Sequence, residues 1–194
     1  MTSILIIGVG GQGTLLTSRI LGNLAIGMGY DVKVSEVHGM SQRGGSVVTY
    51  VRYSEDKVFS ALIDEAGADI VLAFEELEAC RGLKYLKKDG MIVVNTQRIN
   101  PLPVITGAAV YPDNTLELLK AGGAKVIAAN ALDLAVTAGN KKAVNVALLG
   151  VLAAQLNIEK EKWLETLKIT IPAKLLDTNI KAFELGYSFN SKHM

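Results

Sequence analysis

Short apolar runs and helical periodicity alternate along the first part of the chain. Residues 4–7 are consecutive aliphatic residues, which predicts a strand buried on both faces of a sheet. After a glycine-rich turn, residues 14–28 repeat apolar positions at helical spacing, and Gly29 predicts the end of that helix. Residues 31–37 predict a second strand. The order strand, helix, strand indicates a Rossmann-like βαβ unit.

The next segment breaks the simple alternation of strand and helix. Residues 46–53 are rich in β-branched and aromatic side chains and predict a third strand directly after the second. Further strands are expected at residues 70–74, 91–95 and 125–128, and helices at residues 75–87, 116–121, 132–138, 142–157 and 159–168. A final helix is expected between Pro172 and Gly186, and residues 100–114 are expected to form a long loop. Two successive strands predict an α/β fold with a mixed sheet.

Length and composition narrow the class of protein. The 194 residues favour a single domain, residues 1–194, and a hydrophobic fraction of 49% supplies a sizeable core. With 20 basic and 19 acidic residues, the chain lacks the positive field that nucleic-acid binders need. We find no signal peptide and no apolar run long enough to cross roughly 30 Å of hydrocarbon. We therefore expect a cytoplasmic protein with neither nucleic acid nor membrane as a partner.

The cysteine and histidine content limits cofactor chemistry. Cys80 is the single cysteine, which excludes an internal disulfide and an iron–sulfur cluster held by this chain alone. His38 and His193 have no metal-ligand spacing. We expect no metal site and no tightly bound cofactor.

A glycine-rich turn stands between the first strand and the first helix. Gly8, Gly10 and Gly13 match the G-x-G-x-x-G pattern, in which missing side chains let an anion reach the N–H groups of a helix N-terminus. The candidate anion-binding residues here are Gly10, Gly11, Gln12 and Gly13. Glu36, at the end of the second strand, lies where a ribose-binding acid is expected. The alternative is that the glycines only permit a sharp turn and close packing.

A second polar loop follows the second strand. Arg43 offers a planar donor fork suited to phosphate or carboxylate, on a backbone made adaptable by Gly44. Ser41 and Gln42 add neutral donors. The alternative is a solvated surface loop with an ordinary arginine.

Three acids, Glu75, Glu76 and Glu78, follow the predicted strand at residues 70–74. Acids in the first turn of a helix interact favourably with its dipole, and this is the interpretation we favour. The carboxyl end of a strand is also where open α/β sheets bind ligands.

The two glycine-rich segments together resemble one family. Residues 8–13, GVGGQG, followed by residues 35–46, SEVHGMSQRGGS, resemble the gamma-type domain of the 2-oxoacid:ferredoxin oxidoreductases. The form HGMSQRGG is similar to the indolepyruvate enzymes rather than to the pyruvate or 2-oxoglutarate enzymes. Agreement continues at residues 69–78, 94–96, 145–150 and 171–183, so the resemblance spans nearly the whole chain.

The resemblance implies a three-layer α/β/α fold with a mixed, mostly parallel sheet. It also implies an accessory subunit of an enzyme that oxidatively decarboxylates aryl 2-oxoacids, such as indolepyruvate. The acyl group passes to coenzyme A and the electrons pass to ferredoxin. Thiamine diphosphate and iron–sulfur clusters are expected on the larger catalytic (alpha) subunit.

The resemblance associates the gamma-type domain with the coenzyme A side of the reaction and with subunit assembly. If coenzyme A contacts this chain, the residues themselves make the two glycine-rich segments the candidate site for its phosphates. An accessory subunit should also be inactive alone and should expose an apolar patch toward its partner. The remaining alternatives are a self-contained NAD(P)-dependent dehydrogenase and a structural paralogue in another complex.

Overall fold

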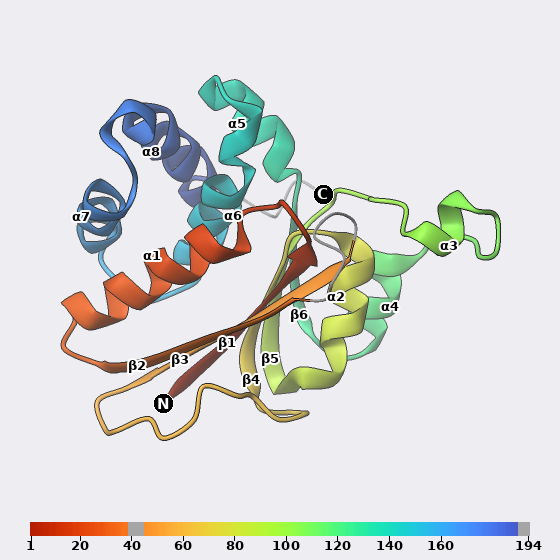
Figure 1. The fold of residues 1–194 in the computed structure, drawn as a ribbon, viewed down its shortest axis with the longest axis horizontal. Helices are drawn as coiled ribbons and strands as arrows, with labels where there is room; N and C mark the ends of the chain where they lie inside the picture. The colour runs from red at the N-terminus through yellow and green to blue at the C-terminus, as the bar shows by residue number, and fades with distance from the viewer. Residues whose placement is uncertain (39–44, 190–194) are drawn as a thin grey trace.

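A mixed sheet forms the centre of the computed structural model, which describes residues 1–38 and 45–189 (Figure 1). Within those residues the strand order is β2-β3-β1-β4-β5-β6, and β3 is the one strand that runs against the others. The strands are β1 (Thr2–Val9), β2 (Asp31–His38), β3 (Ser46–Ser54), β4 (Ala68–Ala73), β5 (Leu86–Asn95) and β6 (Lys125–Ala129). The mixed, mostly parallel sheet is confirmed.

The opening βαβ unit differs from the predicted one in a single respect. Its two parallel strands, β1 and β2, are not neighbours, because β3 lies between them and pairs antiparallel with both. The sequence pattern gives the order and type of the elements, but it carries no direct information on which strands pair.

Helices cover both faces of the sheet, which confirms the three layers (Figure 1). One face carries α1 (Thr14–Gly27), α5 (Ala131–Ala138), α6 (Val144–Ala153), α7 (Lys160–Thr170) and α8 (Ala173–Tyr187). The other carries α2 (Glu76–Gly82) and α4 (Thr115–Ala121). Alternate residues of β1 enter the two cores: Ile4 and Ile6 belong to the core on the first face, with Trp163, and Leu5 belongs to the core on the second, with Leu119.

Two predicted helices are too long. The helix expected over residues 75–87 ends at Gly82, continues as the 3₁₀ turn η1 (Leu83–Tyr85), and gives way to β5 at Leu86. The helix expected over residues 142–157 starts as the 3₁₀ turn η2 (Lys141–Ala143) and ends at Ala153. Both segments keep apolar residues beyond the helix end, so periodicity alone does not place the boundary.

The prediction that Gly186 stops the last helix is wrong, because Gly186 lies inside α8. A Cβ atom there would lie 2.0 Å from the carbonyl oxygen of Ala147 on α6. A Cβ on Gly150 of α6 would lie 2.2 Å from the carbonyl oxygen of Phe183 on α8. The two glycines therefore allow the backbones of α6 and α8 to touch.

The expected loop at residues 100–114 contains a short helix, α3 (Leu102–Ile105). In Figure 1 this segment stands away from the body of the molecule, beyond α2 and α4. Across the described residues, none of the helices has the length and apolar character needed to cross a membrane.

Candidate functional site

The carboxyl ends of β1, β4, β5 and β6 lie along one edge of the sheet, because these strands are parallel. The glycine-rich turn follows β1 at this edge. The helix after β1 covers one face and the helix after β4 covers the other, so the strand order reverses between β1 and β4. Open α/β sheets bind ligands at such a switch point. The turn is therefore at the expected place for a site.

Left-handed backbone at two positions shapes the turn. Gly11 has φ 97° and Gly13 has φ 85°, values that residues with a Cβ rarely adopt. A Cβ on Gly13 would also lie 2.6 Å from Nδ2 of Asn145, whereas a Cβ on Gly11 would meet open space. The glycines thus permit a sharp turn and close packing, as the alternative interpretation requires.

The N–H groups of the turn divide into two kinds. Gly10 N–H donates to the carbonyl oxygen of Gly45 at 3.0 Å, and Gln12 N–H donates to that of Val9 at 3.2 Å. Within the described residues, the N–H groups of Gly11 and Gly13 donate no hydrogen bond. Gly13 is also the N-cap of α1 and supplies no side-chain cap. Among the described residues, these two donors beside the positive end of α1 therefore have no acceptor.

The Gln12 side chain is bonded within the protein. Its Oε1 accepts from Val9 N–H at 2.7 Å, and its Nε2 donates to the carbonyl oxygen of Phe74 at 3.0 Å and to Gln97 Oε1 at 3.3 Å. A Cβ on Gly8 would lie 2.8 Å from Gln12 Oε1, so Gly8 provides the space for this amide. The Gln12 amide therefore links the end of β1 to Phe74, the residue that follows β4.

Further amides, missed by the sequence analysis, hold this edge together. Asn95 is fully buried at the end of β5; its Nδ2 donates to the Phe74 carbonyl oxygen at 3.1 Å, and its Oδ1 accepts from Ala131 N–H at 3.0 Å. Asn145, 5% exposed, donates to the carbonyl oxygen of Gly13 at 3.4 Å. Asn95 could have been identified, because it directly follows the apolar residues 91–94, whereas Asn145 stands before an apolar run and carries no such signal.

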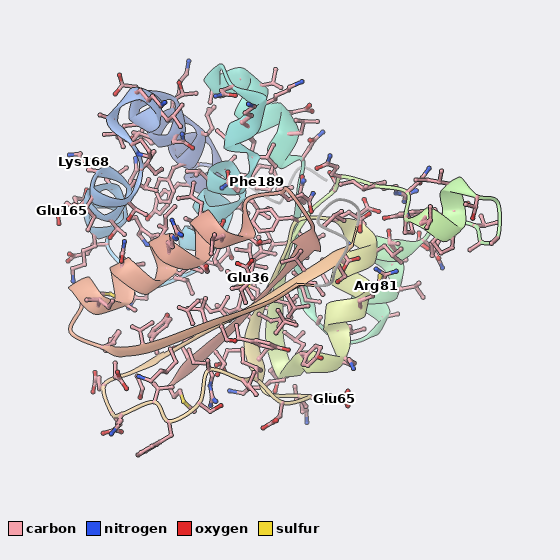
Figure 2. The ribbon with its side chains drawn as sticks, viewed as in Figure 1. Glu36, Glu65, Arg81, Glu165, Lys168 and Phe189 are labelled. Atoms are coloured by element: carbon pink, nitrogen blue, oxygen red, sulfur yellow. The ribbon has the colours of Figure 1, made fainter. Side chains whose placement is uncertain are left out.

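The candidate residues of the second loop, Ser41, Gln42, Arg43 and Gly44, lie outside the described residues. The residues just after them are described. Gly45 accepts the hydrogen bond from Gly10, and Ser46 pairs with Val9 across β3 and β1. The end of the second loop is therefore next to the glycine-rich turn. On β2, Glu36 lies on the side of the sheet that α1 covers (Figure 2).

The three acids at the start of α2 are buried, with exposed fractions of 1% for Glu75, 4% for Glu76 and 3% for Glu78. Glu75 caps the helix by accepting from Glu78 N–H at 2.9 Å, and Glu76 and Glu78 lie in its first turn. The favoured helix-start interpretation is confirmed.

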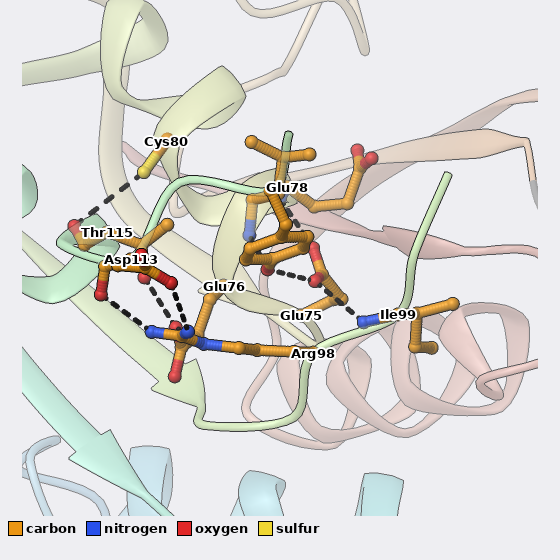
Figure 3. Close-up of polar contacts among 10 residues, drawn as sticks. Glu75, Glu76, Glu78, Cys80, Arg98, Ile99, Asp113 and Thr115 are labelled. Carbon is orange, nitrogen blue, oxygen red and sulfur yellow. Dashed lines mark hydrogen bonds and ion pairs between the residues drawn. The ribbon is translucent and has the colours of Figure 1, made fainter. Parts of the chain in front are cut away.

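Each of these carboxylates also has a partner from another element, and Figure 3 shows those of Glu75 and Glu76. Glu75 accepts from Ile99 N–H at 3.1 Å and from the Tyr111 hydroxyl. Glu76 pairs with Arg98 Nε at 2.9 Å and accepts from the Thr115 hydroxyl. The partners of Glu78 are Arg81 and Ser46. Buried carboxylates that are hydrogen-bonded in this way are typical of groups that hold a structure together.

Two neighbouring groups are held in their neutral forms. Burial, followed by the hydrogen bond to Glu75, raises the pKa of Tyr111. Burial, followed by the charges of Glu75 and Glu76, raises the pKa of the Cys80 thiol, which disfavours a reactive thiolate. Over the described part of the chain, no group of three or more His, Cys, Asp and Glu residues is arranged to hold a metal ion.

The family model for pyruvate ferredoxin/flavodoxin oxidoreductase matches residues 3–189. The chain belongs to this family. Within it, the chain is 44% identical to indolepyruvate oxidoreductase subunit IorB of Thermococcus kodakarensis, over 95% of this chain and 93% of the relative.

Two other comparisons concern the length of related proteins and their fold. The chain is 25% identical to ketoisovalerate oxidoreductase subunit VorA of Methanothermobacter marburgensis, over 97% of this chain but 36% of that longer protein. The crystal structure of the keto/oxoacid ferredoxin oxidoreductase gamma subunit of Geobacter sulfurreducens superimposes with a TM-score of 0.72, covering 96% of each chain at 23% identity. The family therefore includes this domain both as a separate chain and as part of a longer one.

Proposed function

We propose that this chain is the smaller, accessory subunit of an indolepyruvate ferredoxin oxidoreductase. The observation that carries the proposal is the 44% identity, over nearly the whole of both chains, to a protein named as an indolepyruvate oxidoreductase subunit. In the proposed reaction, the carboxyl group of an aryl 2-oxoacid leaves as carbon dioxide. The acyl group passes to the thiol of coenzyme A, and two electrons pass to ferredoxin.

The proposed cofactors belong to a larger subunit. Thiamine diphosphate would supply the carbanion chemistry of decarboxylation and iron–sulfur clusters would carry the electrons. The single cysteine and the lack of a metal-ligand group in the described residues fit poorly with a cluster on this chain. The length of VorA supports a complex in which this domain accompanies further polypeptide.

In the proposed reaction, this chain binds the phosphates of coenzyme A. Its net charge of +1 offers no broad basic surface, so compensation for the phosphates must be local. The N–H groups of Gly11 and Gly13 at the start of α1 supply donors, and Arg43 supplies a positive charge from the neighbouring loop.

A self-contained NAD(P)-dependent dehydrogenase is not favoured. In the doubly wound dinucleotide-binding fold the second strand lies next to the first, whereas here β3 separates them. The carboxyl ends of β1 and β4, beside which a dinucleotide would lie, are also linked by the Gln12 side chain.

The test is to co-express the chain with the larger subunit from its own genome and to purify the complex. We expect a stable complex that reduces ferredoxin with indolepyruvate and phenylpyruvate in a coenzyme A-dependent reaction, and turns over pyruvate and 2-oxoglutarate much more slowly. Failure of the two chains to co-purify, or micromolar binding of NADH by the isolated chain, would contradict the proposal.

A further inference from the structure

The segment between β5 and α4 exposes apolar side chains and carries no charge. Residues 99–112, which we name the arm, contain no Asp, Glu, Lys or Arg, although a fifth of the chain is charged. The aliphatic side chains of its projecting tip are highly exposed: Leu102 is 70% exposed, Ile105 69% and Val110 88%. Figure 1 shows the arm projecting from the body of the molecule. Projecting apolar surface without charge is typical of a contact site.

The arm has ordered backbone of its own. Val104 N–H donates to the carbonyl oxygen of Pro101 at 2.9 Å, and Thr106 N–H donates to that of Leu102 at 2.9 Å. Ala109 N–H closes the turn by donating to the carbonyl oxygen of Pro103 at 3.0 Å. The apolar side chains are thus presented from a defined backbone.

The buried carboxylates described above fix the base of the arm (Figure 3). Glu75 accepts from Ile99 at the start of the arm and from Tyr111 at its end. Just outside the arm, Arg98 pairs with Glu76 and donates from Nη2 to the carbonyl oxygen of Asp113 at 2.9 Å. The first and last residues of the arm are therefore held at one place. This lowers the entropic cost of docking the projecting tip of the arm.

We infer that the arm inserts its projecting apolar tip into an apolar groove on the larger subunit of the complex. This inference rests on the proposed function, which supplies that partner. A stable interface buries about 800 Å² on each partner and involves roughly 20–30 residues a side. Three aliphatic side chains on an arm are too few to hold two copies of this chain together. The arm therefore forms one part of a wider interface with the larger subunit that the proposed function supplies.

The test is the affinity of the purified chain for the purified larger subunit, measured by titration calorimetry. The variant is Leu102→Asp with Ile105→Asp, and the matched control is Ile169→Asp, which changes an aliphatic residue that is 77% exposed on α7, in the other helix layer. We expect the arm variant to bind at least about 30-fold more weakly, the effect of losing one strong interface residue. The control should bind within about threefold of the wild-type chain. Thermal unfolding of the free chains checks that all remain folded.

The outcomes separate this inference from the proposed function. If the wild-type chain and the arm variant bind the larger subunit equally, the arm inference is wrong and the proposed function stands. If the wild-type chain does not bind, both are wrong. If the wild-type chain sediments as a dimer that the arm variant abolishes, the arm contacts a second copy and the inference is overturned.

Discussion

Thr49 on β3 is fully buried, and its hydroxyl has no hydrogen-bond partner among the described residues. A buried polar group without a partner costs about 1–3 kcal/mol, and an apolar replacement of the same shape removes that cost. We expect Thr49→Val to raise the free energy of unfolding by about 1 kcal/mol, measured by chemical denaturation.

The matched control is the reverse change two residues along the same strand. Val51 is also fully buried on the same side of the sheet, so Val51→Thr should lower the free energy of unfolding by about 1–3 kcal/mol. A loss of stability in Thr49→Val would show that the hydroxyl has a favourable contact after all.

The proposed role of Arg43 is to supply a positive charge to the phosphates of coenzyme A. A hydrogen bond involving a charged group contributes about 1.5–3 kcal/mol, so Arg43→Ala should raise the KM for coenzyme A in the assembled complex roughly 10- to 150-fold. Co-elution with the larger subunit should change little. An unchanged KM together with lost co-elution would assign Arg43 to the interface instead.

At the scale of elements, the contact between α6 and α8 depends on Gly150 and Gly186. An added Cβ at Gly186 would approach a backbone oxygen to 2.0 Å, so Gly186→Ala must push the helices apart. We expect a loss of about 3 kcal/mol or more in the free energy of unfolding, the upper range for overpacking.

Gly27, at the end of α1, provides the control for this substitution. A Cβ there would meet nothing within 4 Å. Gly27→Ala should leave stability unchanged or raise it by up to about 1 kcal/mol, because alanine loses less backbone entropy. Equal effects of the two substitutions, measured by thermal denaturation, would contradict a close contact between α6 and α8.

Tyr111 links the end of the arm to α2, and its raised pKa makes that link sensitive to alkaline pH. In the unfolded chain the phenol ionises near its ordinary pKa of 10.0, whereas in the folded protein it stays protonated to higher pH. Above pH 10 the unfolded state therefore binds fewer protons, and stability falls as pH rises. Below pH 10 this contribution is fully present.

Tyr111→Phe should remove that contribution. We expect the variant to be less stable than the wild-type chain at neutral pH, because Glu75 loses a hydrogen-bond donor. Its stability should then decline less steeply between about pH 10 and 11. Denaturation midpoints at several pH values measure both effects, and parallel declines in the two proteins would count against the assignment.

At the scale of the whole molecule, the cysteine content is too low for an iron–sulfur cluster held by this chain alone. The chain has one cysteine, and its described residues contain no metal-ligand group. We expect the isolated chain to contain no iron or thiamine diphosphate and to show no ferredoxin-coupled turnover until the larger subunit is added. Metal analysis and the coupled assay measure this, and substantial turnover by the pure chain would contradict it.

The sequence by itself determined the family and, apart from the short helix α3, the kinds of element and their order. Apolar runs and helical spacing report local burial, so β1, α1 and the unexpected strand β3 were predicted within a few residues of their observed bounds. The glycine-rich turn was predicted because left-handed backbone at Gly11 and Gly13 restricts the residue type locally.

Only the tertiary structure decided what contacts what. The place of β3 between β1 and β2 depends on strand pairing, which residues 46–53 do not encode on their own. Gly186 has the pattern of a helix stop, but the backbone of α6, distant in sequence, makes it a contact residue. The acids of α2 support the arm only because Tyr111 and Arg98 return to them in space. Local pattern records the burial of a residue, whereas its partner is set by packing between segments far apart in the chain.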